Sequence, residues 1–116
     1  MHSRAKGPTK YERERMSRFR DVGCVACWLK GLRTEPQCHH LLSGGKRRGH
    51  RYTVSLCPWH HEGIPFGTLT ILEMDDQFGP SLAHTPRRFT ERFGDDESLL
   101  ELTDKLVEKE MARKVR

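Results

Sequence analysis

Apolar and aromatic residues are scarce in this sequence. Of its 116 residues, 34% are hydrophobic and 8% aromatic, whereas 32% are charged. This length supports one small domain, and so few apolar residues leave it a thin core. Domains of this kind usually need a further stabiliser, such as a structural metal. We therefore expect a single domain over residues 9–116, preceded by a flexible basic lead over residues 1–8.

Long apolar runs are also missing. No run approaches the roughly 20 residues that cross a bilayer, and no apolar stretch follows the basic N-terminus as it would in a signal peptide. These absences predict a cytoplasmic protein that makes no membrane contact.

Cysteine is limited to four residues, which in a reducing compartment favour metal binding over disulfides. Cys24 and Cys27 are three apart, and Cys57 and His60 repeat that offset. Together they predict a tetrahedral Cys3His set for a structural Zn²⁺. A thioredoxin-like redox motif is the rival interpretation, but no strand–helix–strand pattern surrounds the first pair. Cys38 is a competing ligand for the place of His60, and the alternative for it is a buried small apolar residue.

Histidine is concentrated in one stretch. Residues 38–61 hold five of the seven histidines, including the pairs His39-His40 and His60-His61. Imidazole is a common metal ligand and titrates near neutrality, so a metal site with a general base beside it is expected. An ion that neutralises phosphate charge and a base that activates water are what phosphodiester cleavage requires. The histidines available for this second, open site are His39, His40, His61 and His84.

Positive charge is concentrated in the first half of the chain. Residues 1–51 carry 13 Lys and Arg against 4 Asp and Glu, a balance of +9, whereas residues 52–116 carry 8 against 12, a balance of −4. This asymmetry suits a polyanion such as nucleic acid, although a solvated surface has the same composition. The candidate phosphate contacts in the histidine-rich stretch are Lys46, Arg47, Arg48 and Arg51.

Local patterns predict helices at both ends and a hairpin between them. Thr9 and Glu12 form a capping box for a helix through about Arg20, with Tyr11, Phe19 and Val22 on its packed face. Its arginines, which are Arg13, Arg15, Arg18 and Arg20, are expected to face solvent or DNA.

A strand is expected over residues 36–42, a turn at 43–45 and a second strand over 52–56, followed by a short helix opening at Pro58. Residues 63–82 are interpreted as an insertion loop with one turn of helix. A helix begins near Thr85 and ends at Gly94, and a last helix covers residues 96–114.

Several of these strings resemble HNH nucleases with a ββα-metal fold, and within them the phage family of RecA-dependent nucleases and its prophage relatives. The resemblance covers residues 8–107. It is carried by the knuckle at Cys24-Cys27, by CHHLLSGGKRRG at 38–49, by YTVSLCPWHH at 52–61, and by FGPSLAH and FTERFG at 78–84 and 89–94.

The resemblance implies an α+β fold with a small ββα-metal hairpin-plus-helix core, a structural zinc knuckle and flanking helices. It implies His39 as a ligand of a catalytic divalent ion (Mg²⁺ or Mn²⁺, alternatively Zn²⁺), His40 as the general base and His61 as a second ligand. Pro65 occupies the place of the usual further ligand, so His84 is the replacement candidate.

Two features depart from the family pattern. The asparagine expected before the second strand is absent, and His50 lies two residues before Tyr52, which stands near that place; an exposed loop histidine is the simpler interpretation of His50. In addition, adjacent residues of a regular strand point to opposite faces. His39 and His40 can therefore share a site only where the strand is bulged or ends.

The function expected from the resemblance is hydrolysis of DNA phosphodiesters in phage or prophage recombination, with DNA and a RecA filament as partners. A non-catalytic zinc-stabilised nucleic-acid-binding module and an RNA-directed nuclease are the alternatives. The sequence leaves open the DNA preference, the catalytic metal and the oligomeric state.

Overall fold

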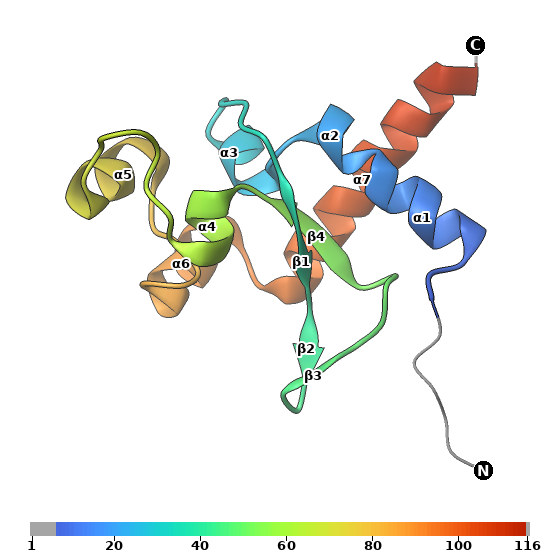
Figure 1. Ribbon diagram of the computed structural model, residues 1–116, viewed down its shortest axis with the longest axis horizontal. Helices are drawn as coiled ribbons and strands as arrows, with labels where there is room; N and C mark the ends of the chain where they lie inside the picture. Colours follow the sequence, from blue (N-terminus) through green and yellow to red (C-terminus); the bar gives the residue numbers. More distant parts are fainter. Residues whose placement is uncertain (1–6, 116) are drawn as a thin grey trace.

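The computed structural model describes residues 7–115, with side chains to residue 113, so most of the predicted basic lead lies outside the described residues. Figure 1 shows the β1–β4 pair in the middle of the molecule, with α1, α2 and α7 on one side and α4, α5 and α6 on the other. None of the helices in the described part is long and apolar enough to span a bilayer. The elements in chain order are α1 (Lys10–Ser17), α2 (Phe19–Val22), α3 (Val25–Leu29), β1 (Gln37–His40), β2 (Leu42–Ser43), β3 (Lys46–Arg47), β4 (Thr53–Leu56), α4 (Pro58–Glu62), α5 (Ile71–Phe78), α6 (Pro86–Phe93) and α7 (Asp96–Val115).

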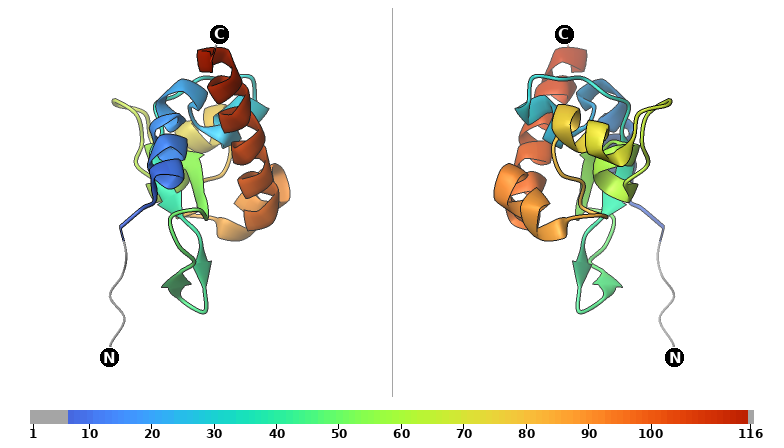
Figure 2. Two further views of the ribbon diagram at one scale, coloured as in Figure 1. Left: turned by 90° about the vertical axis from the view of Figure 1, so that its right-hand side faces the viewer. Right: turned by 90° about the vertical axis from the view of Figure 1, so that its left-hand side faces the viewer.

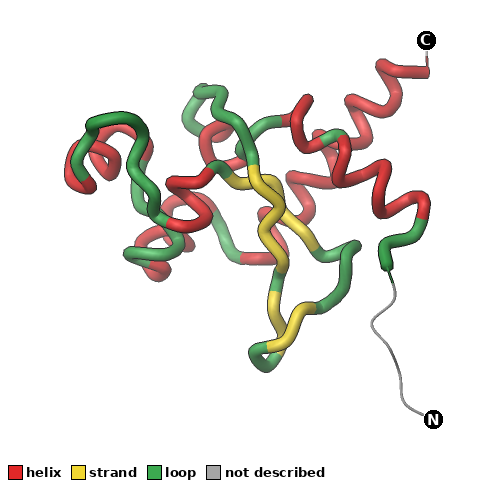
Figure 3. Tube along the Cα trace, in the orientation of Figure 1, coloured by secondary structure: helices red, strands yellow, loops and turns green. Residues whose placement is uncertain are grey.

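Two short antiparallel sheets form the predicted hairpin. β1 pairs with β4 in a regular register that sets His39 opposite Val54 and His40 opposite Thr53. β2 pairs with β3 through a turn at Gly44 and Gly45, both at positive φ, which glycine adopts without strain. The β2–β3 hairpin projects away from the body of the protein (Figure 2). The expected single strand over 36–42 is thus divided after His40, and the stretch between the expected turn and the second strand contains the short strand β3 (Figure 3).

The helices that follow β4 are set by local signals. Cys57 caps α4, and Pro58 occupies its first turn as predicted. α6 is capped by Gly94, where the sequence predicted its end, and it buries Phe89 and Phe93. α7 begins at Asp96, where the sequence placed it.

The insertion interpreted as a loop contains the two-turn helix α5. A reciprocal capping box starts this helix: the Glu73 amide donates to Thr70 Oγ1 at 3.1 Å, and the Thr70 amide donates to Glu73 Oε1 at 2.8 Å. Met74 of this helix is fully buried. The capping box is visible in the sequence and predicts this helix. The frequent glycines and prolines around it led instead to the expectation of a loop with one helical turn.

The core lies between the β1–β4 pair and the helices α2, α3 and α7. Val25, Val54, Leu56 and Val107 are essentially inaccessible to solvent there. Trp59 extends the core towards α5, because its indole Nε1 donates to the Gly79 carbonyl at 2.9 Å. This packing fixes the β4–α4 junction, which carries Cys57 and the adjacent histidines His60 and His61.

The N-terminal helix packs differently from the expectation. The Thr9–Glu12 capping box is confirmed, but the helix breaks at Arg18 into α1 and α2. Tyr11 is 48% exposed, whereas Arg15 is completely buried. The prediction that Tyr11 packs and Arg15 faces solvent was wrong, because Arg15 finds a carboxylate partner, Asp104, far along the chain.

Replacing Arg15 by alanine should strongly destabilise the fold. A fully buried side chain would then be lost, and the buried hydroxyl and carbonyl of Thr53 would lose their hydrogen bonds to it; truncating a large buried side chain to alanine typically costs about 2–5 kcal/mol. Urea denaturation monitored by circular dichroism measures the change. Arg13→Ala is the control, because Arg13 lies on the same helix and is exposed; equal losses for the two variants would contradict the structural role of Arg15.

Candidate metal centres

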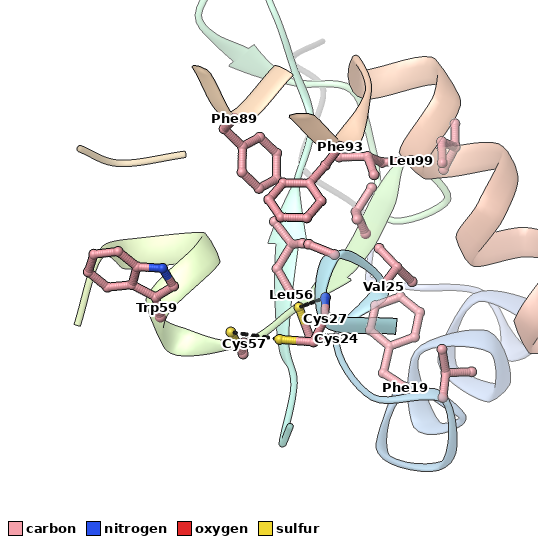
Figure 4. Close-up of a cluster of buried hydrophobic side chains, with 14 of the residues drawn as sticks. Phe19, Cys24, Val25, Cys27, Leu56, Cys57, Trp59, Phe89, Phe93 and Leu99 are labelled. Atoms are coloured by element: carbon pink, nitrogen blue, oxygen red, sulfur yellow. Dashed lines mark hydrogen bonds between the residues drawn. The ribbon is translucent and has the colours of Figure 1, made fainter. Parts of the chain in front are cut away.

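Four buried donor atoms converge where α3 meets the start of α4. His60 Nδ1 lies 3.4, 3.5 and 3.3 Å from the sulfurs of Cys24, Cys27 and Cys57, and the Cys27 and Cys57 sulfurs are 3.9 Å apart. Figure 4 shows the three cysteines together beneath Phe89 and Phe93. Within the described residues, only this set brings three or more possible metal ligands within 4.8 Å of one another.

These distances fit a tetrahedral zinc ion. Zn–S bonds of about 2.3 Å and Zn–N bonds of about 2.0 Å place sulfurs roughly 3.8 Å apart and sulfur and nitrogen roughly 3.6 Å apart. The predicted Cys3His set can therefore hold a structural Zn²⁺. The metal interpretation of the Cys24-Cys27 knuckle is favoured over the redox one, because Cys57 and His60 complete a four-ligand set around it.

Groups around the cluster orient its ligands. His60 Nε2 donates to the Phe78 carbonyl at 2.8 Å, which leaves Nδ1 to face the sulfurs. The Thr34 hydroxyl donates to Cys27 Sγ at 3.1 Å. Because Phe78 ends α5, the inserted helix helps to fix the zinc ligand.

The electrostatics of the cluster favour a cation at its centre. Hydrogen bonding with Cys24 is the main cause that lowers the pKa of Cys57 and raises that of Cys27. Burial opposes protonation of His60, but hydrogen bonds with Cys24 and Cys57 outweigh it and raise the pKa of His60 to about 9. Thiols this close compete for protons, and a bound divalent ion relieves the competition.

Cys38 is not part of the cluster. Its thiol is half-buried and donates to Met16 Sδ at 3.7 Å, and burial is the main cause that raises its pKa. His60 supplies the fourth donor, so the alternative in which Cys38 takes its place does not match this arrangement.

A second histidine pair lies beside the first centre. The rings of His39, from β1, and His61, from α4, meet edge to face with centroids 4.9 Å apart. His61 Nδ1 donates to Gln37 Oε1 at 2.9 Å, and its Nε2 has no hydrogen-bond partner within residues 7–113. Gln37 and His39 are two residues apart and thus share one face of β1; Gln37 was missed at the sequence level, although this spacing could have indicated it.

His39 is held in its neutral form. Burial, with smaller contributions from His61 and His40, lowers its pKa to about 4. A neutral imidazole keeps the nitrogen lone pair that metal binding requires. His39 can therefore supply a nitrogen ligand near neutral pH, next to the ring of His61.

His40 has a different neighbour from His39. Its ring faces that of His50, with centroids 6.0 Å apart, in accordance with the alternation of a regular strand. Burial, then Arg47, His50 and His61, lower the pKa of His40. His50 is half-buried, so its interpretation as an exposed loop histidine was wrong; it lies in the turn before β4, and the path of this turn brings its ring to that of His40.

The structure does not bring His84 into a compact group with His39 and His61. Its Nε2 donates to the Gly63 carbonyl at 2.9 Å, and its ring packs on Trp59 with centroids 5.5 Å apart. As a third ligand, His84 would have to leave the Gly63 carbonyl or use Nδ1. Its role as a ligand stays a prediction.

The four basic residues predicted to hold DNA fall into two groups. Lys46 and Arg47 are exposed on the projecting β2–β3 hairpin. Arg48 instead pairs with Glu97 at 2.6 Å, and Arg51 pairs through both of its terminal nitrogens with Asp104 at 3.1 and 2.9 Å. Lys46 and Arg47 form no ion pair with any side chain that the structure describes, whereas the other two are engaged by α7.

Zinc binding can be tested with two cysteine variants. We expect about one tightly held zinc per chain in Cys38→Ser, as in the unchanged protein, because Cys38 lies outside the cluster. Cys57→Ser should lose the zinc and most of the folded structure, since structural zinc contributes folding free energy directly. Metal analysis with circular dichroism measures both effects; zinc loss in Cys38→Ser, or a folded zinc-loaded Cys57→Ser, would contradict the assignment.

Comparison with known proteins agrees with the resemblance noted in the sequence. Residues 8–108 match the family described as "Recombination enhancement, RecA-dependent nuclease". A search of curated proteins finds no match. The match covers nearly the whole chain, including both histidine pairs and the Cys3His cluster, and the chain therefore belongs to the family of recombination-enhancing, RecA-dependent nucleases.

Proposed function

We propose that this nuclease is a metal-dependent DNA endonuclease of the HNH, or ββα-metal, type. The observation that carries the proposal is the contact between His39 and His61 at the junction of a two-stranded hairpin and a short helix. One nitrogen of His61 is held by Gln37 and the other is free. The pair is anchored beside a centre suited to structural zinc but does not belong to it.

In this proposal His39 and His61 hold a catalytic divalent ion through neutral imidazoles. When bound, the ion would neutralise charge on the scissile phosphate and leaving oxygen. Imidazole pairs accept several metals, so Mg²⁺, Mn²⁺ and Zn²⁺ all remain candidates. His39 is supported by β1, and His61 by α4 and the Gln37 amide, so the two ligands come from separate elements.

His40 is proposed as the general base that takes a proton from water. Its lowered pKa keeps it neutral at neutral pH, which is the form a base needs. His40 is the last residue of β1, and the end of a strand is one of the two conditions under which neighbouring histidines can share a site. His61 lowers the pKa of both His39 and His40, which places the three imidazoles within electrostatic range of one another.

DNA is proposed as the substrate because the family acts in recombination and the exposed cations lie on the projecting hairpin. Lys46 and Arg47 are placed to contact backbone phosphates, which gives affinity without sequence preference. A RecA filament is the proposed partner, by the family description alone. Comparing nicking rates with and without RecA filaments on D-loop DNA tests that partnership; equal rates would remove RecA from the proposal.

The role of His40 predicts a large loss of activity on substitution. His40→Ala should lower plasmid nicking in Mg²⁺ or Mn²⁺ by about 10²–10⁴-fold, the usual contribution of a general base, with the zinc content unchanged. Gel separation of supercoiled and nicked plasmid measures the rate. Full activity in His40→Ala would exclude this role.

His84→Ala, assayed alongside His39→Ala and His61→Ala, tests the ligand set. The observed hydrogen bond of His84 to Gly63 predicts that His84→Ala retains much more activity than the other two. A loss as large as that of His39→Ala would instead make His84 the third ligand.

Substitutions on the hairpin should weaken DNA binding and its salt dependence. Lys46→Ala and Arg47→Ala should each reduce the slope of log affinity against log salt by about 1, since each removes one phosphate contact. Fluorescence anisotropy with labelled duplex DNA measures the slope, and the inactive His40→Ala background prevents cleavage. Lys105→Ala, which removes an exposed cation on α7, is the control; equal effects at Lys105 would mean that net charge, not the hairpin, determines binding.

A further inference from the structure

A buried hydrogen-bonded network joins α1, β4 and α7 beneath the His40 side of the hairpin. Arg15 is at its centre and has no solvent exposure. Its Nη1 and Nη2 donate to Thr53 Oγ1 at 2.6 Å and to the Thr53 carbonyl at 2.8 Å, and its Nε donates to Asp104 Oδ1 at 2.9 Å. Planar guanidinium groups with several partners of this kind have little freedom to move.

Thr53 connects this network to His40 and His50. Its hydroxyl accepts from Arg15 and donates its single proton to the His50 carbonyl at 3.0 Å. Thr53 is also the cross-strand partner of His40. One side chain thus contacts the backbone of His50 while its own backbone is paired with that of His40.

Asp104 holds the same loop from its other side. Besides Arg15, its carboxylate accepts from both terminal nitrogens of Arg51, at 3.1 and 2.9 Å, and Arg51 directly follows His50. Two consecutive loop residues are therefore anchored to α7, one through Thr53 and Arg15 and one directly.

We propose that Asp104, Arg15 and Thr53 are positioning residues that set the His50 ring against the His40 ring. The inference rests on the proposed function, in which His40 is the general base. None of the three belongs to the proposed metal site. Their effect passes through the His50 carbonyl and the β1–β4 register to the imidazole that is to accept the proton.

Stability alone gives a poor explanation for this network. Buried ion pairs contribute little more, and often less, than well-packed apolar residues of similar volume. What apolar residues cannot supply is direction, because only the hydrogen bonds of Arg15 and Thr53 fix where the His50 carbonyl lies. A role in positioning explains why the Arg15–Asp104 ion pair and the Thr53 hydroxyl occupy a place where apolar side chains would suffice for folding.

Imidazole NMR of the zinc-loaded full-length protein, labelled with ¹⁵N-histidine, tests the proposal without any need for activity. Thr53→Val keeps the branched shape but removes the hydroxyl, so it should shift the ring signals of His40 and His50 and weaken the cross-relaxation between them. The signals of His39 and His61 should stay in place. Thr53→Ser should restore the original spectrum, and Glu101→Gln, which alters an exposed carboxylate on α7, should leave it unchanged.

Nicking kinetics give a second readout. Thr53→Val and Asp104→Asn should lower kcat by about 10- to 100-fold, the loss typical of a misplaced catalytic group, with KM nearly unchanged. The double variant Arg15→Met/Asp104→Leu replaces the ion pair with apolar side chains and should fold and bind zinc. It should still show the reduced kcat, whereas a merely structural role would be repaired.

Two results would overturn the proposal. One is an unchanged arrangement of the His40 and His50 signals in folded Thr53→Val; the other is wild-type kcat in the folded double variant. Failure of the proposed function is distinguishable, since it would be seen as equal nicking by His40→Ala and the unchanged protein, whatever the NMR spectra show.

Discussion

The convergence of Cys24, Cys27, Cys57 and His60 on one small volume is the constraint on which the remaining structure depends. It ties a turn near the N-terminus to the junction of β4 and α4, two segments about thirty residues apart in the sequence. Because the apolar core is small, this cluster supplies stability that a larger apolar core provides in other domains. His60 and His61 are adjacent on α4, about 100° apart around the helix. When one is fixed towards the sulfurs, the other is directed at His39.

The two faces of β1 are therefore supported by different means. On one face, the Cys3His cluster and Gln37 fix the position of His61, whose ring contacts that of His39. On the other, contacts from α7 through Arg15 and Thr53 reach the loop that carries His50. The short insertion helix α5 adds to the first support, since the Phe78 carbonyl holds the His60 ring. In the proposed mechanism, the ligand His39 and the base His40 are adjacent residues with different ring neighbours, His61 for His39 and His50 for His40.

The sequence was most informative where chemistry depends on short spacing. Two repeats of a three-residue offset predicted the Cys3His cluster, and the Thr9–Glu12 pair predicted the first helix cap. The resemblance carried by the strings around both histidine pairs predicted the family. Each of these signals is contained within a few residues, so folding does not alter it.

What the sequence could not provide depends on distant contacts. Arg15 resembles any arginine of an exposed helix until Asp104, 89 residues later, is seen to accept its hydrogen bond. His50 resembles an exposed loop residue until the turn before β4 brings its ring to 6.0 Å from that of His40. His84 was chosen by elimination, and its actual neighbours, Trp59 and Gly63, are set by the path of the insertion. The cap of α5, by contrast, was readable at Thr70 and Glu73 but was obscured by the surrounding glycines and prolines.

The central claim is that a second ion binds through His39 and His61, apart from the structural zinc. Pulsed electron paramagnetic resonance of Mn²⁺ added to the zinc-loaded protein tests this most directly, since it detects nitrogen nuclei bound to the ion. If His39 and His61 both bind the ion, we expect coupling to two imidazole nitrogens, reduced to one in His39→Ala and in His61→Ala, with the zinc retained throughout. Bound Mn²⁺ without nitrogen coupling, or coupling that survives both substitutions, would contradict it.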